Sequence, residues 1–476
     1  MGYTDKQVEQ EARAFVEEHF EEVAADIARL VSQRSVEEPD KAADGAPWGP
    51  GPRAALDIAL ELMAREGLAV TDGEGYLGWG DLPGTSGKTV AMISHVDVVP
   101  EGPGWDSEPY VMDRREGYLV GRGVIDDKGP WVVALWATKF MAMLAERQGA
   151  PLAHTIRLIA GCNEETGMGD VHWYLEHQAE PDFLFTPDGS WPVIYAEKGG
   201  FKAEFVSAPL GEENRVIVEL AGGHVTNAIP FEAHAIVRAD ASALPAADRV
   251  TVTDLGDGTC RIEGHGKGGH ASLPEGSVNA IGLVTDYLLA NGLCNDAERA
   301  YLELEHDVMG STDASTLGFA STDDVFGPTT CIGGTVRTTD DGHFVQTIDS
   351  RYVTTVTGEQ IEAAVREVAS RHGATVEGVR VTVPSVGDKD SAAVRALVDT
   401  YNELTDHQDE PLAIGGGTYA RHFAHGVAFG PEDPYETFPA WCGAMHGPNE
   451  VVSERTLKDA FVIYCVALWR LMQVEL

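Results

Sequence analysis

The chain has 476 residues, 53 of them glycine, and a formal net charge of −42 at pH 7. Its length exceeds what one ordinary core accommodates, so we expect two domains. So negative a surface repels nucleic acid and anionic lipid, and neither is expected as a partner; the acidity itself indicates solubility or a salty environment.

The six cysteines are spread along the chain without a C-x-x-C pair, which argues against a disulfide framework or a thiolate zinc site. The first 30 residues are charged and have helical periodicity, without an apolar signal core. The longest apolar stretch begins at Trp131 and is interrupted by Lys139. A cytoplasmic protein without membrane contact is therefore predicted.

Helix and strand patterns alternate in the first part of the chain. Helices are predicted up to about Leu30 and from Arg53 to about Glu66, separated by a loop rich in proline and glycine. Strand patterns at 88–98 and 154–165 then alternate with helical patterns at 130–148 and 169–178. This order predicts an α/β domain with a mainly parallel sheet flanked by helices.

The pattern changes near Lys198, where strands with two-residue alternation begin. We predict a catalytic domain of residues 1–198 and 382–476, interrupted by an α+β lid domain at 199–381. Residues 216–240 and 329–353 share a Gly-Gly pair, a turn and a return strand, so the lid could consist of two similar halves. Chance similarity of two hairpins is the alternative.

Histidines and carboxylates recur where apolar runs end. His95 and Asp97 follow one strand pattern, and a metal-bound imidazole needs an acceptor for its second nitrogen, which Asp97 could supply. Asp126-Asp127 follows the run LVGRGVI, predicted as a strand, and one of its carboxylates could bridge two metals. A strand-end turn and a solvated capping turn are the respective alternatives.

Glu164-Glu165 is a second carboxylate pair, in which one member can bind a metal while the other faces water as a general base. A capping pair that opens the next helix is the alternative. Asp188 again follows an apolar run, and His446 lies in a late glycine-rich loop. Because sites in open α/β sheets form at the carboxyl ends of the strands, these groups together predict a two-metal hydrolytic site.

The motifs HVDVVP, GRGVIDDKGP, GCNEETGMGD, TPDGSWP and MHGPNE, in this order, resemble the M20 family of dinuclear zinc peptidases. The resemblance is greatest to the PepV-like branch of Xaa-His or β-Ala-Xaa dipeptidases. It implies two zinc ions per chain, with Mn²⁺ or Co²⁺ as possible substitutes. The resemblance implies that His95 and Asp188 bind one zinc ion, that Glu165 and His446 bind the other, and that Asp126 bridges both. It also implies that Glu164 is the general base and that Asp97 orients His95. It also implies a cis peptide bond between Asp126 and Asp127.

In the insert, GHGKGGHASLPEGSVNAI resembles the family's lid motif and implies that His270 stabilises the oxyanion. His265, five residues earlier, is a rival that the pattern G-H-A-S-x-P disfavours. Asn227 and Arg351 match positions that grip the substrate, and Gly416 and Gly417 resemble a loop of backbone donors. A lid this long can supply His270 within one chain, so a monomer is expected.

The resulting hypothesis is a metal-dependent dipeptidase for short unblocked dipeptides, with water activated by two zinc ions and Glu164 as base. A small peptide is then the partner. A related amidohydrolase that removes acyl groups from amino acids is one alternative, since the metal ligands do not separate the two chemistries. A non-catalytic binding protein on the same fold is the other.

Overall fold

The computed structural model describes residues 3–211 and 214–476, and these divide into two compact units. Unit 1 comprises Met1–Tyr195, Val386–Leu412 and Gly417–Leu476, and unit 2 comprises Ala196–Ser385 and Ala413–Gly416. The short segment Ala413–Gly416 lies within the range that we expected to belong to the catalytic domain, but its contacts place it in unit 2.

Unit 1 is built on a mixed sheet whose central strands run parallel. The parallel strands lie in the order β6-β3-β7-β24, and antiparallel strands β2 and β9 continue the sheet on either side. The fold class predicted from the alternating patterns is confirmed. The strands of this sheet are β1 (Ala69–Gly73), β2 (Leu77–Leu82), β3 (Thr89–His95), β6 (Thr155–Gly161), β7 (Phe183–Thr186), β9 (Ile194–Glu197), β22 (Ser385–Val386), β23 (Leu412–Ile414) and β24 (Gly426–Ala428).

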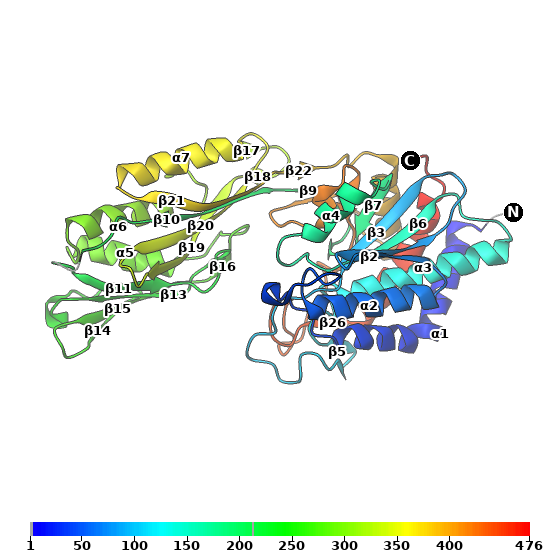
Figure 1. The fold of residues 1–476 in the computed structure, drawn as a ribbon, viewed down its shortest axis with the longest axis horizontal. Helices are drawn as coiled ribbons and strands as arrows, with labels where there is room; N and C mark the ends of the chain where they lie inside the picture. Colours follow the sequence, from blue (N-terminus) through cyan, green and yellow to red (C-terminus); the bar gives the residue numbers. More distant parts are fainter. Residues whose placement is uncertain (1–2, 212–213) are drawn as a thin grey trace. The chain divides into compact units, whose positions relative to one another are not determined.

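Helices cover both faces of this sheet (Figure 1). One face packs its apolar side chains, such as Met92 and Leu158, against helices whose buried stripes repeat at helical spacing. The other face, which includes Ile93, packs against α4 and the turn η3 (Tyr419–His422). The helices of unit 1 are α1 (Asp5–Val31), α2 (Pro50–Arg65), α3 (Lys128–Gln148), α4 (Gly169–His177), α8 (Ala392–Thr405) and α9 (Glu454–Leu471).

The start of α1 shows why the helix begins where it does. Thr4 accepts a hydrogen bond from the backbone N–H of Gln7, and the Gln7 side chain accepts one from the backbone N–H of Thr4. This capping box satisfies two N–H groups that have no partner inside the helix. The predicted end near Leu30 agrees with the observed end at Val31.

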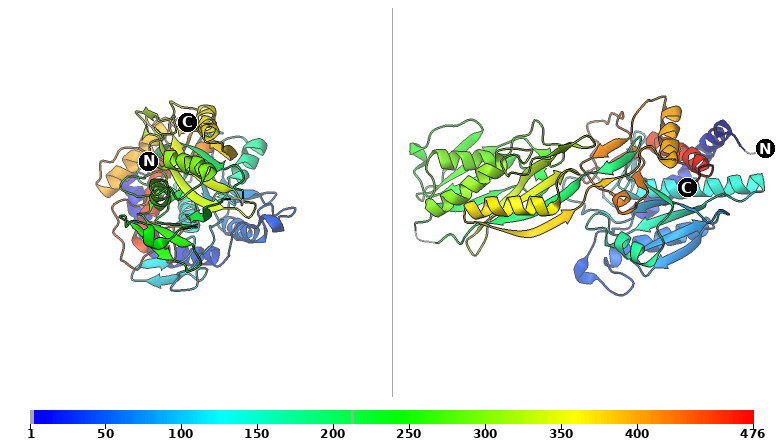
Figure 2. Two further views of the ribbon diagram at one scale, coloured as in Figure 1. Left: turned by 90° about the vertical axis from the view of Figure 1, so that its left-hand side faces the viewer. Right: turned by 90° about the horizontal axis from the view of Figure 1, so that it is seen from above.

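Unit 2 is built on an antiparallel sheet in the order β14-β15-β13-β11-β19-β20-β10-β21. Its strands and helices are coloured green to yellow in the views of Figure 2. Helices α5, α6 and α7 share one continuous apolar core with one face of this sheet. The bounds are β10 (Gly199–Val206), β11 (Ile217–Gly222), β13 (Glu232–Val237), β14 (Val250–Asp254), β15 (Cys260–His265), β19 (Thr330–Thr338), β20 (Phe344–Tyr352), β21 (Thr375–Thr382), α5 (Ala280–Ala290), α6 (Asp296–Met309) and α7 (Gly358–Arg371).

The two segments with similar sequences form corresponding hairpins of this sheet. Residues 216–240 contain the pair β11 and β13, and residues 329–353 contain the pair β19 and β20. The hairpins meet where Gly222 of β11 pairs with Val336 of β19. Four strands thus lie on each side of this junction, and a lid built from two similar halves stays a prediction.

None of the helices in the described parts of the chain is long and apolar enough to cross a membrane.

A buried carboxyl group in unit 2 predicts a pH-dependent stability. Glu305 of α6 is fully buried, and burial raises its pKa to about 8, with the Tyr301 hydroxyl opposing part of this shift. The unfolded chain releases this proton above about pH 4.5, whereas the folded chain keeps it up to about pH 8. The folded state therefore loses stability as the pH rises between these values. Glu305→Gln removes the proton release and should stabilise the protein at pH 8 by on the order of 1 to 3 kcal/mol more than at pH 4.5.

Denaturant unfolding at the two pH values measures this difference. Glu303→Gln is the matched control, because Glu303 is exposed on the same helix, and it should change stability equally at both pH values. A Glu305→Gln effect that is the same at pH 4.5 and pH 8 would contradict the assignment.

Candidate metal centre

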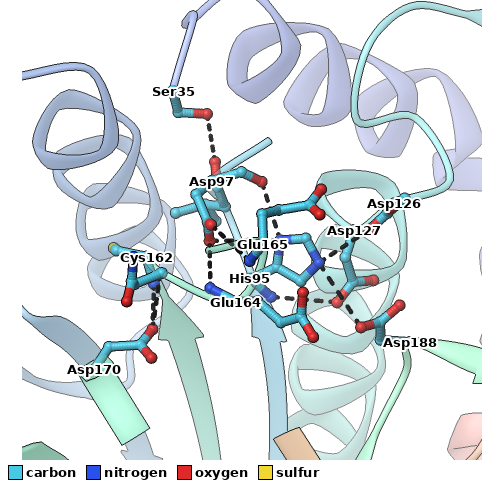
Figure 3. Close-up of polar contacts among 12 residues, drawn as sticks. Ser35, His95, Asp97, Asp126, Asp127, Cys162, Glu164, Glu165, Asp170 and Asp188 are labelled. Atoms are coloured by element: carbon cyan, nitrogen blue, oxygen red, sulfur yellow. Dashed lines mark hydrogen bonds and ion pairs between the residues drawn. The ribbon is translucent and has the colours of Figure 1, made fainter. Parts of the chain in front are cut away.

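The carboxyl ends of neighbouring parallel strands bring three of the predicted ligands, His95, Glu165 and Asp188, together in unit 1 (Figure 3). The register of β3 and β6 pairs His95 with Gly161, so the loop that carries Glu164 and Glu165 starts beside His95. Asp188 follows β7, which is the other neighbour of β3. The parallel arrangement thus converts residues far apart in sequence into one cluster.

Asp97 connects His95 to the two glutamates. Nδ1 of His95 lies 3.0 Å from the backbone carbonyl oxygen of Asp97 and 3.5 Å from its carboxylate Oδ1. The same carboxylate accepts hydrogen bonds from the backbone N–H groups of Glu164 at 3.3 Å and Glu165 at 3.2 Å. Asp97 therefore contacts His95 mainly through its backbone, and its buried side chain fixes the glutamate loop as well.

The local structure around Asp126 differs from the predicted strand end. Strand β5 (Tyr118–Val120) belongs to a separate small sheet with β4 (Asp113–Arg115) and β26 (Val451–Ser453). Asp127 occupies the N-cap position of α3. The intervening loop contains Gly123 with φ of +94°, a conformation that interrupts a strand. The peptide bond between Asp126 and Asp127 is cis, as the resemblance implied.

The Asp126 carboxylate lies between two imidazoles. Its Oδ1 is 3.0 Å from Nε2 of His95, and its Oδ2 is 2.8 Å from Nε2 of His446. Nε2 of His446 is also 3.2 Å from Oε2 of Glu165, and Nε2 of His95 is 3.8 Å from Oδ2 of Asp188. Each side of Asp126 thus holds one imidazole and one further carboxylate, which is the donor set of two adjacent metal sites.

Two groups of side chains in the described residues bring ligand atoms within 4.8 Å of one another: His95 with Glu164 and Asp188, and His95 with Asp126 and Glu165. Nε2 of His95 is buried and has no hydrogen-bond partner, although carboxylates surround it. A buried nitrogen lone pair that faces carboxylates fits a metal cation. The first group includes Glu164, so its position alone permits a ligand role as well as the expected role of base.

The electrostatics of the cluster also favour a cation. Burial, together with the charge of Asp126, raises the pKa of Asp188 to about 8. Burial and nearby carboxylates likewise hold the pKa of Glu164 well above its ordinary value. Hydrogen bonds to Asp126 and Glu165 raise the pKa of His446 to about 11. Carboxylates this crowded repel one another, and a dication among them relieves that repulsion.

Unit 2 gathers the residues predicted to hold substrate. The short strands β12 (Ala228–Ile229) and β16 (Gly269–His270) pair, and the backbone N–H of Ala271 donates to the Asn227 carbonyl oxygen at 2.9 Å. Asn227 and His270 are therefore close neighbours. Nδ1 of His270 lies 2.7 Å from the Ser272 hydroxyl. His265, in contrast, is exposed at the end of β15, where its Nε2 contacts the Thr251 hydroxyl.

Arg351 lies on β20, opposite Thr330 of β19. Its Nε donates to Asp349 Oδ1 at 2.7 Å, its Nη2 to Asp349 Oδ2 at 3.3 Å, and its Nη1 to the Gly415 carbonyl oxygen at 3.0 Å. A guanidinium has five N–H groups, so hydrogens on Nη1 and Nη2 remain for a further acceptor. Arg351 thus forms an ion pair with Asp349 of its own strand.

The glycine loop divides between the units. Gly416 belongs to unit 2, and Gly417 begins the next segment of unit 1. The close approach occurs one residue earlier, because a Cβ on Gly415 would lie 2.4 Å from the Ser272 Cβ. Gly415 is thus the position in this run where a side chain does not fit.

Several residues that contact the ligand-bearing loops were not singled out from the sequence. The carboxylate of Asp170 accepts hydrogen bonds from the backbone N–H groups of Cys162 at 2.6 Å and Asn163 at 3.0 Å and from the Tyr419 hydroxyl at 2.5 Å. Arg122 and Glu450 contact the loops of Asp126 and His446. Asp170, Arg122 and Glu450 lie inside the motifs quoted above, and this position could have pointed to them. The sequence around Tyr419 did not indicate that its hydroxyl contacts Asp170.

A parallel sheet with a histidine and carboxylates where its strands end, together with a separate antiparallel unit inserted in the chain, suits a metal-dependent hydrolase. The chain belongs to the peptidase family M20/M25/M40, whose sequence profile matches residues 91–470.

Relatives support this membership along the whole chain. A protein of Staphylococcus aureus (strain bovine RF122 / ET3-1) that bears the name "Putative dipeptidase" is 29% identical over 487 residues, covering 97% of this chain and 99% of its own. Human carnosine dipeptidase 1 has the same fold, with a TM-score of 0.59 at 14% identity over 98% of this chain and 99% of that chain. The dipeptidase Dug1p of Saccharomyces cerevisiae has a TM-score of 0.58 at 12% identity and covers 100% of both chains.

Proposed function

We propose that this protein is a dizinc dipeptidase of the PepV-like branch that hydrolyses short unblocked dipeptides. The observation that carries the proposal is the Asp126 carboxylate, whose two oxygens face His95 and His446 at 3.0 and 2.8 Å. Such a carboxylate can bridge two metal ions. The name of the S. aureus relative, which aligns over nearly the whole chain, supports peptide hydrolysis.

The side chains that would hold the two ions are His95 and Asp188 for one, Glu165 and His446 for the other, and Asp126 for both. When bound, the metals would lower the pKa of a water molecule and polarise the scissile carbonyl. Glu164 would take the proton of that water and later deliver it to the leaving amine. The backbone hydrogen bond from Glu164 to Asp97 holds this carboxylate beside the metal ligands.

The competing proposal is removal of an acyl group from an amino acid by the same metal centre. A substrate panel with carnosine, Ala-Ala and N-acetylornithine separates the two functions. We expect hydrolysis of at least one of the dipeptides and none of N-acetylornithine. Turnover of N-acetylornithine alone would contradict the dipeptidase proposal. Two bound zinc ions without turnover of any compound on a broad dipeptide library would favour a binding protein.

We propose that His270 of unit 2 donates a hydrogen bond to the developing oxyanion. Asn227 of unit 2 and the loop glycines Gly416 and Gly417 would bind the peptide backbone. The contact between Nδ1 of His270 and the Ser272 hydroxyl would orient the imidazole for this task. The protein would act as a monomer, with His270 supplied by the same chain.

We further propose that Arg351 binds the terminal carboxylate of the substrate through the edge of its fork that Asp349 leaves open. The wild-type enzyme should then lose about 10²-fold or more in kcat/KM when a dipeptide is replaced by its C-terminal amide, because a charge-assisted bidentate pair is lost. In Arg351→Ala the acid and the amide should differ much less.

The matched control is Arg337→Ala, since Arg337 lies on the adjacent strand β19 and pairs with Glu204 on the surface. This variant should discriminate between acid and amide as the wild type does. Equal hydrolysis of acid and amide by the wild type would contradict both the role of Arg351 and a strict requirement for a free carboxylate.

A further inference from the structure

A buried ion pair joins the loops that carry two of the proposed metal ligands. Nη1 of Arg122 lies 2.5 Å from Oε2 of Glu450, and their side chains are 1% and 0% exposed. Burial of both charges is unfavourable unless their other donors and acceptors also find partners. The remaining contacts of this pair therefore indicate what it does.

Glu450 uses its second carboxylate oxygen to hold the loop before Asp126. Oε1 accepts hydrogen bonds from the backbone N–H groups of Gly123 at 2.9 Å, Ile125 at 3.3 Å and Asp126 at 3.4 Å. These N–H groups have no strand partner, because β5 ends at Val120. One carboxylate thus fixes the backbone from which the bridging side chain projects.

Arg122 uses its other guanidinium nitrogen to hold the His446 loop. Nη2 lies 3.2 Å from the His446 carbonyl oxygen and 3.3 Å from the carbonyl oxygens of Pro100 and Glu101. His446 has φ of +63°, a left-handed conformation that a non-glycine residue keeps only when its surroundings enforce it. The hydrogen bond from Arg122 is one such constraint.

We propose that Arg122 and Glu450 are positioning residues of the metal centre, Arg122 for the ligand His446 and Glu450 for the bridging Asp126. This inference rests on the proposed function, because it takes the centre to bind two metal ions. The pair contacts the backbone of the ligands and no reacting group. Nδ1 of His95 is held by Asp97 and not by this pair. A defect at Arg122 should therefore weaken binding of the metal ion on Glu165 and His446 more than binding of the ion on His95 and Asp188.

Two conservative variants test the proposal. Arg122→Lys keeps the charge but loses the planar fork that reaches Glu450 and the carbonyl groups together. Glu450→Gln keeps the shape, but its amide nitrogen cannot accept a hydrogen bond. In Arg122→Lys the zinc ion on Glu165 and His446 should bind about 10 to 100-fold more weakly, the usual effect of losing a group that orients metal ligands, while the affinity for the other ion changes much less. In Glu450→Gln both ions should bind more weakly, because Asp126 is shared between them. Competition with a chromophoric chelator measures both affinities, and excess zinc should restore the turnover of Arg122→Lys.

The matched control is Arg157→Lys in the same unit. Nε and Nη2 of Arg157 form a bidentate pair with Asp81 at 2.7 and 2.8 Å, between β6 and β2, and this pair contacts none of the proposed ligands. The control should lower the melting temperature and leave both zinc affinities unchanged.

The outcomes are distinguishable. If both zinc ions weaken equally in Arg122→Lys, or neither weakens, the pair is a purely structural element and the inference is overturned. If Glu450→Gln does not fold, Arg122→Lys alone decides. If the wild type itself binds fewer than two zinc ions, the proposed function fails, and the inference fails with it.

Discussion

Glu164→Gln should lower kcat by a factor on the order of 10² to 10⁴ and leave zinc binding nearly intact. The amide has nearly the shape of the carboxylate but cannot take a proton from water. Glu164 lies within 4.8 Å of ligand atoms of His95 and Asp188, and the Asp97 carboxylate holds its backbone. The loss should therefore appear in kcat, with little change in KM for a dipeptide.

Metal analysis of the purified variant separates the two roles that the position of Glu164 permits. Glu176→Gln, an exposed site on α4, is the control and should behave as the wild type. If Glu164→Gln lost its metals but retained turnover per bound zinc, Glu164 would be the metal ligand and Glu165 the general base.

His270→Ala should lower kcat by about 10² to 10³-fold, the typical effect of removing one donor to an oxyanion. Zinc content should remain that of the wild type, because no proposed ligand lies in unit 2. His265→Ala is the matched control in the same glycine-rich segment. His265 is exposed, and its Nε2 contacts Thr251, so its removal should leave kcat unchanged. A large effect of His265→Ala on kcat, with no effect of His270→Ala, would show that His265 and not His270 stabilises the oxyanion.

Mixing the variants tests whether one chain supplies all groups. If His270 acts within its own chain, Glu164→Gln and His270→Ala proteins combined should show only the sum of their residual activities. Recovery of activity on mixing would show that the histidine comes from a second chain, and the monomer would be rejected.

The sequence predicted those parts of the site that depend on local pattern. A buried parallel strand has a recognisable apolar run with polar residues after it. This pattern predicted the positions of four residues that lie at the end of a strand or in the loop after it: His95, Glu164, Glu165 and Asp188. Of the run LVGRGVI before Asp126, which was predicted as a strand, only Leu119 and Val120 lie in β5. The rest forms a loop, because an apolar run does not reveal its hydrogen-bond partners. Its acceptor is Glu450, 324 residues later in the chain. Only the folded structure brings the two together.

The same limit applies to Asp97 and Arg351. The spacing His-x-Asp predicted a carboxylate that orients the imidazole, but the imidazole lies closer to the Asp97 backbone carbonyl, and the carboxylate binds the glutamate loop. The alternation along β20 placed Arg351 on a strand, but it did not reveal that Asp349, two residues away on the same face, occupies part of its fork. Side-chain partners of this kind depend on tertiary packing.

The most direct test of the central claim is a zinc titration of the metal-free protein in which bound zinc and dipeptide hydrolysis are measured together. We expect negligible hydrolysis without metal and full hydrolysis when two zinc ions are bound per chain. Hydrolysis at the full rate by the metal-free protein, or a maximum binding of one ion per chain at full activity, would contradict it.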